Sequence, residues 1–205
     1  MEKFAETQVP IHDLIGRRWS PRTFSEHPVE RDKLVSVFEA ARWAASASNE
    51  QPWAFLVATR EDSKNYADLL SVLVEFNRSW ARTAPVLILT VAHTHFEKDG
   101  RPNRHGYYDL GQAVENLSLQ ATALGLTTHQ MAGFDAAAAR TLFAIPAGWD
   151  AVSAIALGYP GPLHSLPENL QQRETAPRRR KALETFVFSG AWANPAPLTC
   201  PAETK

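Results

Sequence analysis

The chain has 205 residues, of which 44% are hydrophobic and 21% charged, as in ordinary globular proteins. A chain of this length can bury about 70% of the surface that it exposes when unfolded, so stability requires neither a disulfide nor a structural metal. The formal net charge of −1 excludes a field over the whole molecule that would hold nucleic acid or an anionic membrane.

The two ends of the chain carry little functional signal. Residues 1–10 contain no apolar signal core, and the longest apolar stretch, residues 85–92, is too short to span a bilayer. Cys200 is the only cysteine, which excludes an intrachain disulfide and suits a reducing compartment. We therefore expect a cytoplasmic protein with one domain over residues 1–205. Its Pro-rich tail, from about residue 193, is expected to form no regular structure.

The first half of the chain predicts two helices and two strands. Residues 28–45 are predicted to be helical, and residues 53–58 form a short apolar run typical of a strand. A second helix is predicted over residues 63–78, and a buried strand over residues 85–91. The apolar positions at helical spacing are Leu34, Phe38, Ala41 and Ala45 in the first helix and Tyr66, Leu69, Leu70, Leu73 and Phe76 in the second.

The second half opens with a polar loop over residues 93–104 and a long helix over residues 108–124. The helix carries an apolar stripe rich in alanine, which suits close helix packing or a subunit interface. The stripe consists of Leu110, Ala113, Val114, Leu117, Ala121 and Leu124. Strands are predicted over residues 126–131 and 151–157, a helix capped by Asp135 runs to about residue 143, and residues 183–188 are predicted to be extended. Because helices and short strands alternate irregularly, the pattern favours a layered α+β fold.

Two basic clusters are candidates for holding a phosphate, since the sequence has no Gly-rich dinucleotide fingerprint and no P-loop. In the first, Arg18 and Arg22 flank Ser20, and guanidinium groups form forked, charge-assisted hydrogen bonds with phosphate oxygens. A solvated charged turn is the alternative. The second cluster is the run of like charges over residues 178–181, which an anionic partner would help to order. Its alternatives are a solvated basic loop and a weak nucleic-acid patch.

A loop rich in amides lies between the first predicted helix and the first predicted strand. Asn49 and Gln51 each offer donors and acceptors, and a flavin ring presents the matching mixture along its pyrimidine edge. A lone amide in a loop is usually a turn former, but here two of them precede a Pro-Trp pair.

Other chemistry-bearing side chains give weaker signals. His93 and His95 could form half of a metal site, but no third ligand lies at a recognisable spacing, so we expect no metal. His129 is expected to be packed or hydrogen-bonded rather than catalytic. Tyr107 and Tyr108 are expected to anchor the core, with a place at a pocket mouth as the alternative. No nucleophile-elbow motif supports covalent hydrolysis.

Taken in order, these segments resemble the FMN-dependent nitroreductase family over about residues 11–192. The resemblance is carried by residues 18–24 (RWSPRTF), 39–53 (EAARWAASASNEQPW), 125–128 (GLTT), 133–135 (GFD), 157–160 (LGYP) and the basic run before Leu183. It implies a nitroreductase-like α+β fold, with a mixed, mostly antiparallel sheet wrapped by helices. It also implies an intertwined homodimer with the long helix in its interface and FMN bound between the subunits.

The resemblance also implies roles for particular residues. Arg18, Trp19, Ser20 and Arg22 would hold the phosphate and ribityl end, and Arg178 and Arg180 would form a second phosphate clamp. The flavin ring would be contacted by Ala45, Ser46, Ala47, Asn49 and Gln51, some from the partner subunit, and by Gln130, Met131, Ala132 and Gly133. No side chain is expected to be an obligatory acid or base.

The family also implies a reaction. NADH or NADPH would deliver hydride to FMN, and a nitroaromatic, a quinone or another activated electrophile would then accept it in a ping-pong cycle. Two departures bear on the acceptor: Ala132 replaces a frequent acidic residue, and residues 77–80 lack a lysine. A dehalogenase, a single-metabolite reductase and a non-catalytic binding protein on the same scaffold remain alternatives.

Overall fold

A computed structural model describes residues 3–199 and has a four-stranded sheet at its centre. In spatial order the strands are β1 (Trp53–Thr59), β2 (Val86–His93), β4 (Trp149–Gly158) and β3 (Thr127–Met131). All three strand pairs are antiparallel. The predicted α+β fold is confirmed, and the four predicted strands are present with ends moved by one or two residues.

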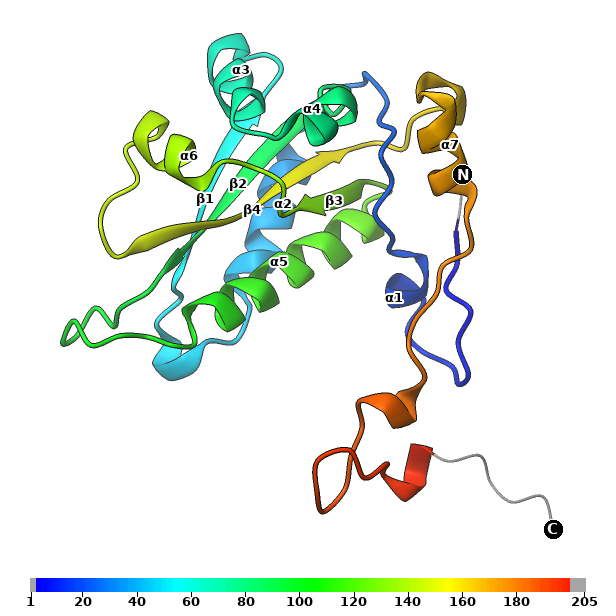
Figure 1. Cartoon of the computed structure of the whole chain (residues 1–205). Coiled ribbons are helices and arrows are strands. Elements are labelled where there is room, and N and C mark those ends of the chain that lie inside the picture. The colour runs from blue at the N-terminus through cyan, green and yellow to red at the C-terminus, as the bar shows by residue number, and fades with distance from the viewer. Residues whose placement is uncertain (1–2, 200–205) are drawn as a thin grey trace.

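Helices cover both faces of this sheet (Figure 1). One face carries α2 (Arg31–Arg42) and α5 (Gly106–Ala123); the other carries α3 (Ser63–Ser71), α4 (Glu75–Ala81) and α6 (Ala136–Leu142). The side chains of β2 alternate between the two cores: Val86, Ile88 and Ala92 join α2 and α5, while Leu87, Leu89 and Val91 join α3 and α4. Burial on both faces explains why this strand is an unbroken apolar run in the sequence.

The long helix α5 buries the predicted stripe. Leu110, Ala113, Val114, Leu117 and Ala121 are all buried, whereas Leu124 follows the helix and is only partly covered. Its alanines allow α2 to pack closely along it. None of the helices in residues 3–199 has the length and hydropathy of a bilayer-spanning segment.

The single helix predicted over residues 63–78 is wrong, because the chain forms α3 and α4 with a break between them. In the break Val74 donates its N–H to the carbonyl of Gly133 at 3.1 Å, and Asp135 donates to the carbonyl of Val72 at 2.8 Å. Pairing with residues 133–135 thus replaces helical hydrogen bonds. The break also turns Phe76 outward, where it is 46% exposed.

The C-terminal part of the chain departs from the predicted extended segment. After α7 (Glu168–Thr175), a 3-10 turn covers Leu183–Thr185, and another covers Pro197–Thr199 in the tail that we expected to be irregular. A bridge between Phe188 and Pro195 closes a small loop between these turns. Figure 1 shows this segment, in orange and red, running past α1 (Asp13–Arg17) and away from the sheet. Cys200 and Pro201 lie outside the described residues.

Candidate functional site

The segment that follows α1, residues 18–22, is here called the arginine loop. Arg18 donates from Nη1 to Ser20 Oγ at 3.4 Å, and its Nε lies 3.9 Å from Glu115 Oε1 on α5. The Arg18 side chain is 18% exposed, so the guanidinium is held against the body of the protein rather than solvated. This excludes the alternative of a freely solvated turn.

Arg22 is fixed by a carboxylate from the other end of the chain. Glu174, in the last turn of α7, is 1% exposed. Its Oε1 accepts the backbone N–H of Arg22 at 2.5 Å, and its Oε2 accepts from Arg22 Nη1 at 3.3 Å. A second guanidinium nitrogen, Arg22 Nε, is buried and has no hydrogen-bond partner among residues 3–199. A buried donor without an acceptor is costly, so this nitrogen is suited to an oxyanion.

Arg178 joins the same cluster through the backbone. Its Nη1 donates to the carbonyls of Lys3 and Gly16, each at 2.7 Å, and its Nη2 donates to the carbonyl of Arg18 at 2.8 Å. Burial and the nearby charges of Arg18 and Arg180 lower the pKa of Arg178. Repulsion between these cations means that a bound anion would stabilise all of them.

Arg180 is placed differently from Arg178. It is exposed, and its Nη1 donates to the neighbouring carbonyl of Arg179 at 2.9 Å. Of the two predicted clamp residues, Arg178 is therefore already occupied with backbone carbonyls, while Arg180 keeps most of its guanidinium accessible. Their roles toward a cofactor stay predictions.

The end of β3 lies against the arginine loop. His129 Nδ1 is 2.9 Å from the carbonyl oxygen of Pro21, and its ring lies 4.5 Å from that of the buried Trp80. Burial lowers the pKa of His129 to about 4. The hydrogen bond to Pro21 acts in the opposite direction, and the charge of Arg22 lowers the pKa further. The ring is therefore neutral at pH 7 and donates to Pro21, which confirms the expectation of a packed, hydrogen-bonded histidine.

The residues that follow His129 are predicted to approach a flavin ring. Gln130 is exposed, and its Nε2 lies 3.5 Å from Ser118 Oγ on α5, while Met131 is buried. Ala132 is exposed, and Gly133 is held by Asn77, whose Nδ2 donates to the Gly133 carbonyl at 2.9 Å. A Cβ on Gly133 would lie 2.6 Å from that Nδ2, so glycine is required for this contact.

The loop of residues 45–51, here called the amide loop, lies at the start of α5. Asp109, 2% exposed, accepts the N–H of Ala47 at 3.0 Å, and Ser46 Oγ accepts the N–H of Gln51 at 3.0 Å. The backbone is left-handed at Ser48, Asn49 and Gln51, with φ of 55°, 58° and 51°. Non-glycine residues in this region are uncommon and cluster at functional sites, because the surrounding structure must offset the strain.

The structure brings together the arginine loop, the end of β3 and Arg178, and it keeps the amide loop apart from them within one chain. Asp109 holds the amide loop, and Glu115 lies beside Arg18, which separates the two anchor points by roughly 9 Å along α5. Figure 1 shows the same separation, with α1 beside the C-terminal half of α5 and the segment after α2 at its other end.

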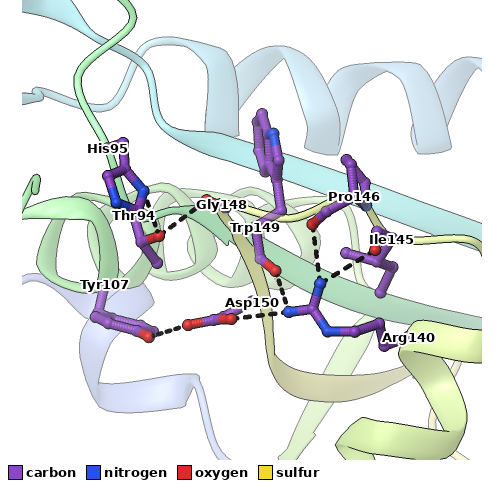
Figure 2. Close-up of polar contacts among 9 residues, drawn as sticks. All are labelled: Thr94, His95, Tyr107, Arg140, Ile145, Pro146, Gly148, Trp149 and Asp150. Atoms are coloured by element: carbon purple, nitrogen blue, oxygen red, sulfur yellow. Dashed lines mark hydrogen bonds and ion pairs between the residues drawn. The ribbon is translucent and has the colours of Figure 1, made fainter. Parts of the chain in front are cut away.

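A polar network fixes the end of the sheet next to the amide loop (Figure 2). Arg140 donates to the carbonyls of Ile145, Pro146 and Trp149 and to the carboxylate of Asp150. Asp150 in turn accepts from the hydroxyl of Tyr107 at 2.5 Å, which raises the pKa of Tyr107. Tyr107 and Tyr108 are 49% and 69% exposed, so the expectation that they anchor the core is wrong.

A cavity of about 140 Å³ lies beneath the arginine loop. Its lining includes the cationic side chains of Lys3 and Arg18, the carboxylate of Glu174, and the apolar side chains of Trp19 and Leu126. Among residues 3–199, no group of three or more His, Cys, Asp or Glu side chains is arranged to hold a metal ion.

Two acidic residues that organise this site, Glu174 and Asp109, were not singled out from the sequence. Glu174 lies in a polar helix far from the arginines in sequence, and nothing in its neighbourhood marks it as buried. Asp109 was inside the predicted long helix, where its position beside the buried stripe could have indicated a buried carboxylate.

Comparison with known proteins identifies the class. The family model described as Nitroreductase family matches residues 15–75 and 65–159. The chain belongs to the nitroreductase family and is an oxidoreductase of the nitroreductase type.

Two similar proteins extend this assignment. A Streptomyces coelicolor protein provisionally described as an NADH dehydrogenase/NAD(P)H nitroreductase is 32% identical over 158 residues, which cover 67% of this chain and 77% of that protein. A crystal structure described as an oxidoreductase containing FMN superposes with a TM-score of 0.87 at 32% identity, covering 92% of this chain and 96% of that chain.

A third relative bears on the alternative activities. Rat iodotyrosine deiodinase 1 is 27% identical over 127 residues, which cover 51% of this chain and 45% of that protein. The chain thus spans less than half of the deiodinase.

Proposed function

We propose that this protein is a homodimeric FMN-dependent oxidoreductase that takes hydride from NADH or NADPH and passes it to a small acceptor in a ping-pong cycle. The acceptor class is a nitroaromatic, a quinone or another activated electrophile. The proposal rests on the family and on the FMN and NAD(P)H named for the two relatives described above.

The observation that carries the proposal is the convergence of three arginines from both ends of the chain. Arg178 donates to the carbonyl of Arg18, Glu174 holds Arg22, and the buried Nε of Arg22 has no acceptor within the described part of the chain. Forked guanidinium groups match the geometry of a phosphate, and like charges held close together favour a dianion. The residues present therefore fit the phosphate of FMN. Ser20 and the backbone of Trp19 complete this half of the site.

FMN would supply the redox chemistry, because its ring accepts hydride from a nicotinamide and gives it to an acceptor. The protein's own residues bind and orient it. Asn49 and Gln51 offer amide donors and acceptors to the pyrimidine edge, with Ala45, Ser46 and Ala47 nearby, and residues 130–133 approach the ring. No side chain is assigned as an obligatory acid or base.

A homodimer explains how separated halves of the site can meet. The C-terminal segment carries large apolar side chains that are open to solvent: Phe186 is 56%, Trp192 is 90% and Leu198 is 83% exposed. Trp43, at the end of α2, is 74% exposed. Exposed aromatic side chains in such number are typical of an interface, and a second copy of the chain would bury them. The amide loop of one subunit would then complete the site of the other.

A dehalogenase is the second candidate, favoured by the similarity to the deiodinase. Specificity in either case would lie in the loop over residues 94–105, next to the exposed Tyr107 and Tyr108. Assays of FMN-loaded, pre-reduced protein with nitroaromatics, quinones and halogenated phenols separate the two candidates.

The direct test replaces Arg22 with Ala. The purified wild-type protein should be a yellow dimer that is bleached by NADH or NADPH and recoloured by air. Arg22→Ala should retain FMN at least about tenfold more weakly, because it loses charge-assisted bonds to the phosphate. FMN affinity is measured by flavin fluorescence, and fold by circular dichroism. Arg42→Ala, at an exposed arginine paired with Glu39, is the control. Unchanged FMN affinity in Arg22→Ala would refute the phosphate site.

A further inference from the structure

Glu174 is the one buried carboxylate that contacts the arginine loop among the described residues, and the proposed function assigns it no part in binding a ligand. It is 1% exposed, and a buried carboxylate must be paired to stay ionised. Both of its oxygens are used by a single residue, since Oε1 accepts from the backbone N–H of Arg22 and Oε2 from its Nη1.

This two-point contact restricts the Arg22 side chain. Binding the backbone and the guanidinium of one residue through one carboxylate leaves the side chain few rotamers. The Nε then remains buried and free of partners in residues 3–199. Thr23, the next residue, is held as firmly, because its hydroxyl contacts the Pro162 carbonyl and Ser165 Oγ, both at 2.9 Å.

Glu174 also ties the arginine loop to the base of the C-terminal segment. Lys3 Nζ donates to the backbone carbonyl of Glu174, and Arg178, four residues further on, donates to the carbonyls of Lys3 and Arg18. The negative charge of Glu174 offsets repulsion among Arg22, Arg178 and Lys3. The pKa of Lys3 is lowered, chiefly by burial and further by the two arginines, while the charge of Glu174 acts in the opposite direction.

We propose that Glu174 is a positioning residue for the cofactor's phosphate, acting through Arg22. It holds the guanidinium of Arg22 in the orientation that donates to a phosphate oxygen. A residue of α7 thereby raises the affinity of the protein for the phosphate. This inference rests on the proposed function, because it requires that Arg22 binds the phosphate of FMN.

The test compares FMN with riboflavin, which lacks the phosphate. Dissociation constants of both ligands for apo-protein are measured by fluorescence, and their ratio reports the phosphate contribution alone. Glu174→Gln keeps the size of the side chain but leaves one acceptor where the carboxylate has two, so one donor of Arg22 loses its partner. We expect the riboflavin-to-FMN ratio to fall by at least about tenfold. Glu168→Gln, at an exposed glutamate in the first turn of the same helix, should leave the ratio unchanged.

A double-mutant cycle tests whether Glu174 acts through Arg22. In an Arg22→Gln background, Glu174→Gln should not lower the ratio further, because the group that it positions is gone. If Glu174→Gln fails to fold, Glu174→Asp is measured instead. Its shorter side chain keeps the charge but cannot reach both the backbone N–H and the guanidinium of Arg22, so its riboflavin-to-FMN ratio should lie between those of the wild type and Arg22→Gln.

Three results would count against these assignments. An unchanged ratio with a lower melting temperature would make Glu174 purely structural, and a raised ratio would mean that its carboxylate competes with the phosphate; either overturns the inference. A wild-type protein that binds FMN no more tightly than riboflavin would instead overturn the proposed phosphate site itself.

Discussion

The two ends of α5 carry two halves of the candidate site that are built in opposite ways. At the C-terminal half, Arg18, Arg22 and Arg178 are already oriented by carbonyls and by a buried carboxylate. At the N-terminal end, the amide loop is largely exposed and left-handed at three non-glycine positions. Within one chain, the arginines that we propose bind the phosphate are thus held in place, whereas the amide loop is left open, as the proposed homodimer requires. Three predictions test this contrast, beginning with the largest expected effect.

The first prediction concerns the anchoring of the N-terminal end of α5. A Cβ on Gly106 would lie 2.3 Å from the carbonyl oxygen of His93, whereas one on Gly111 would meet no atom within 4 Å. Gly106→Ala should lower the free energy of unfolding by about 3 kcal/mol, because the backbone of His93 must move. Gly111→Ala should raise it by about 0.5–1 kcal/mol, because alanine favours helix. Urea denaturation measures the free energy of unfolding of both variants. Equal free energies would show that the close approach of Gly106 to His93 does not hold this end of α5.

The second prediction concerns His129, which packs under the arginine loop. Its pKa is lowered to about 4 from an unfolded value near 6.5. The unfolded ring therefore takes up a proton below pH 6.5 while the folded ring does not, so stability falls as pH drops from 6.5 towards 4, by up to about 3 kcal/mol. His129→Asn keeps a donor near Pro21 and cannot titrate. Denaturation curves from pH 4 to 8 should be flatter for this variant, and identical slopes would contradict the assignment.

The third prediction separates Arg178 from Arg180, the two residues of the C-terminal run that we propose contact the phosphate. Arg178→Ala removes three hydrogen bonds to carbonyls and should destabilise the protein by about 2 kcal/mol. Arg180→Ala should change stability by less than about 0.5 kcal/mol, because the side chain is exposed. Thermal denaturation measures stability, and fluorescence measures FMN affinity. A loss of FMN affinity in Arg180→Ala without a loss of stability would identify Arg180 as the contact to the phosphate; equal stability losses would remove the contrast between the two residues.

Much of the fold could be predicted because its signals are local. The apolar run of β2 and the stripe of α5 follow from periodicity, and Asp135 caps α6 by accepting from Ala137 and Ala138 as predicted. The break between α3 and α4 could not be predicted, since the hydrogen bonds that replace the helix come from residues 133–135. The exposure of Tyr107 was missed for a related reason, because its partner Asp150 lies on a distant strand.

The candidate site divides in the same way. The sequence by itself determined the kinds of groups available: arginines at both ends, amides before the first strand, and a family resemblance that the comparisons confirmed. Only the tertiary structure decided which of them meet. The contact of Glu174 with Arg22 and that of Arg178 with the carbonyl of Arg18 each join residues more than 150 positions apart in the chain. No pattern of spacing encodes such contacts, because they depend on how the helices pack around the sheet.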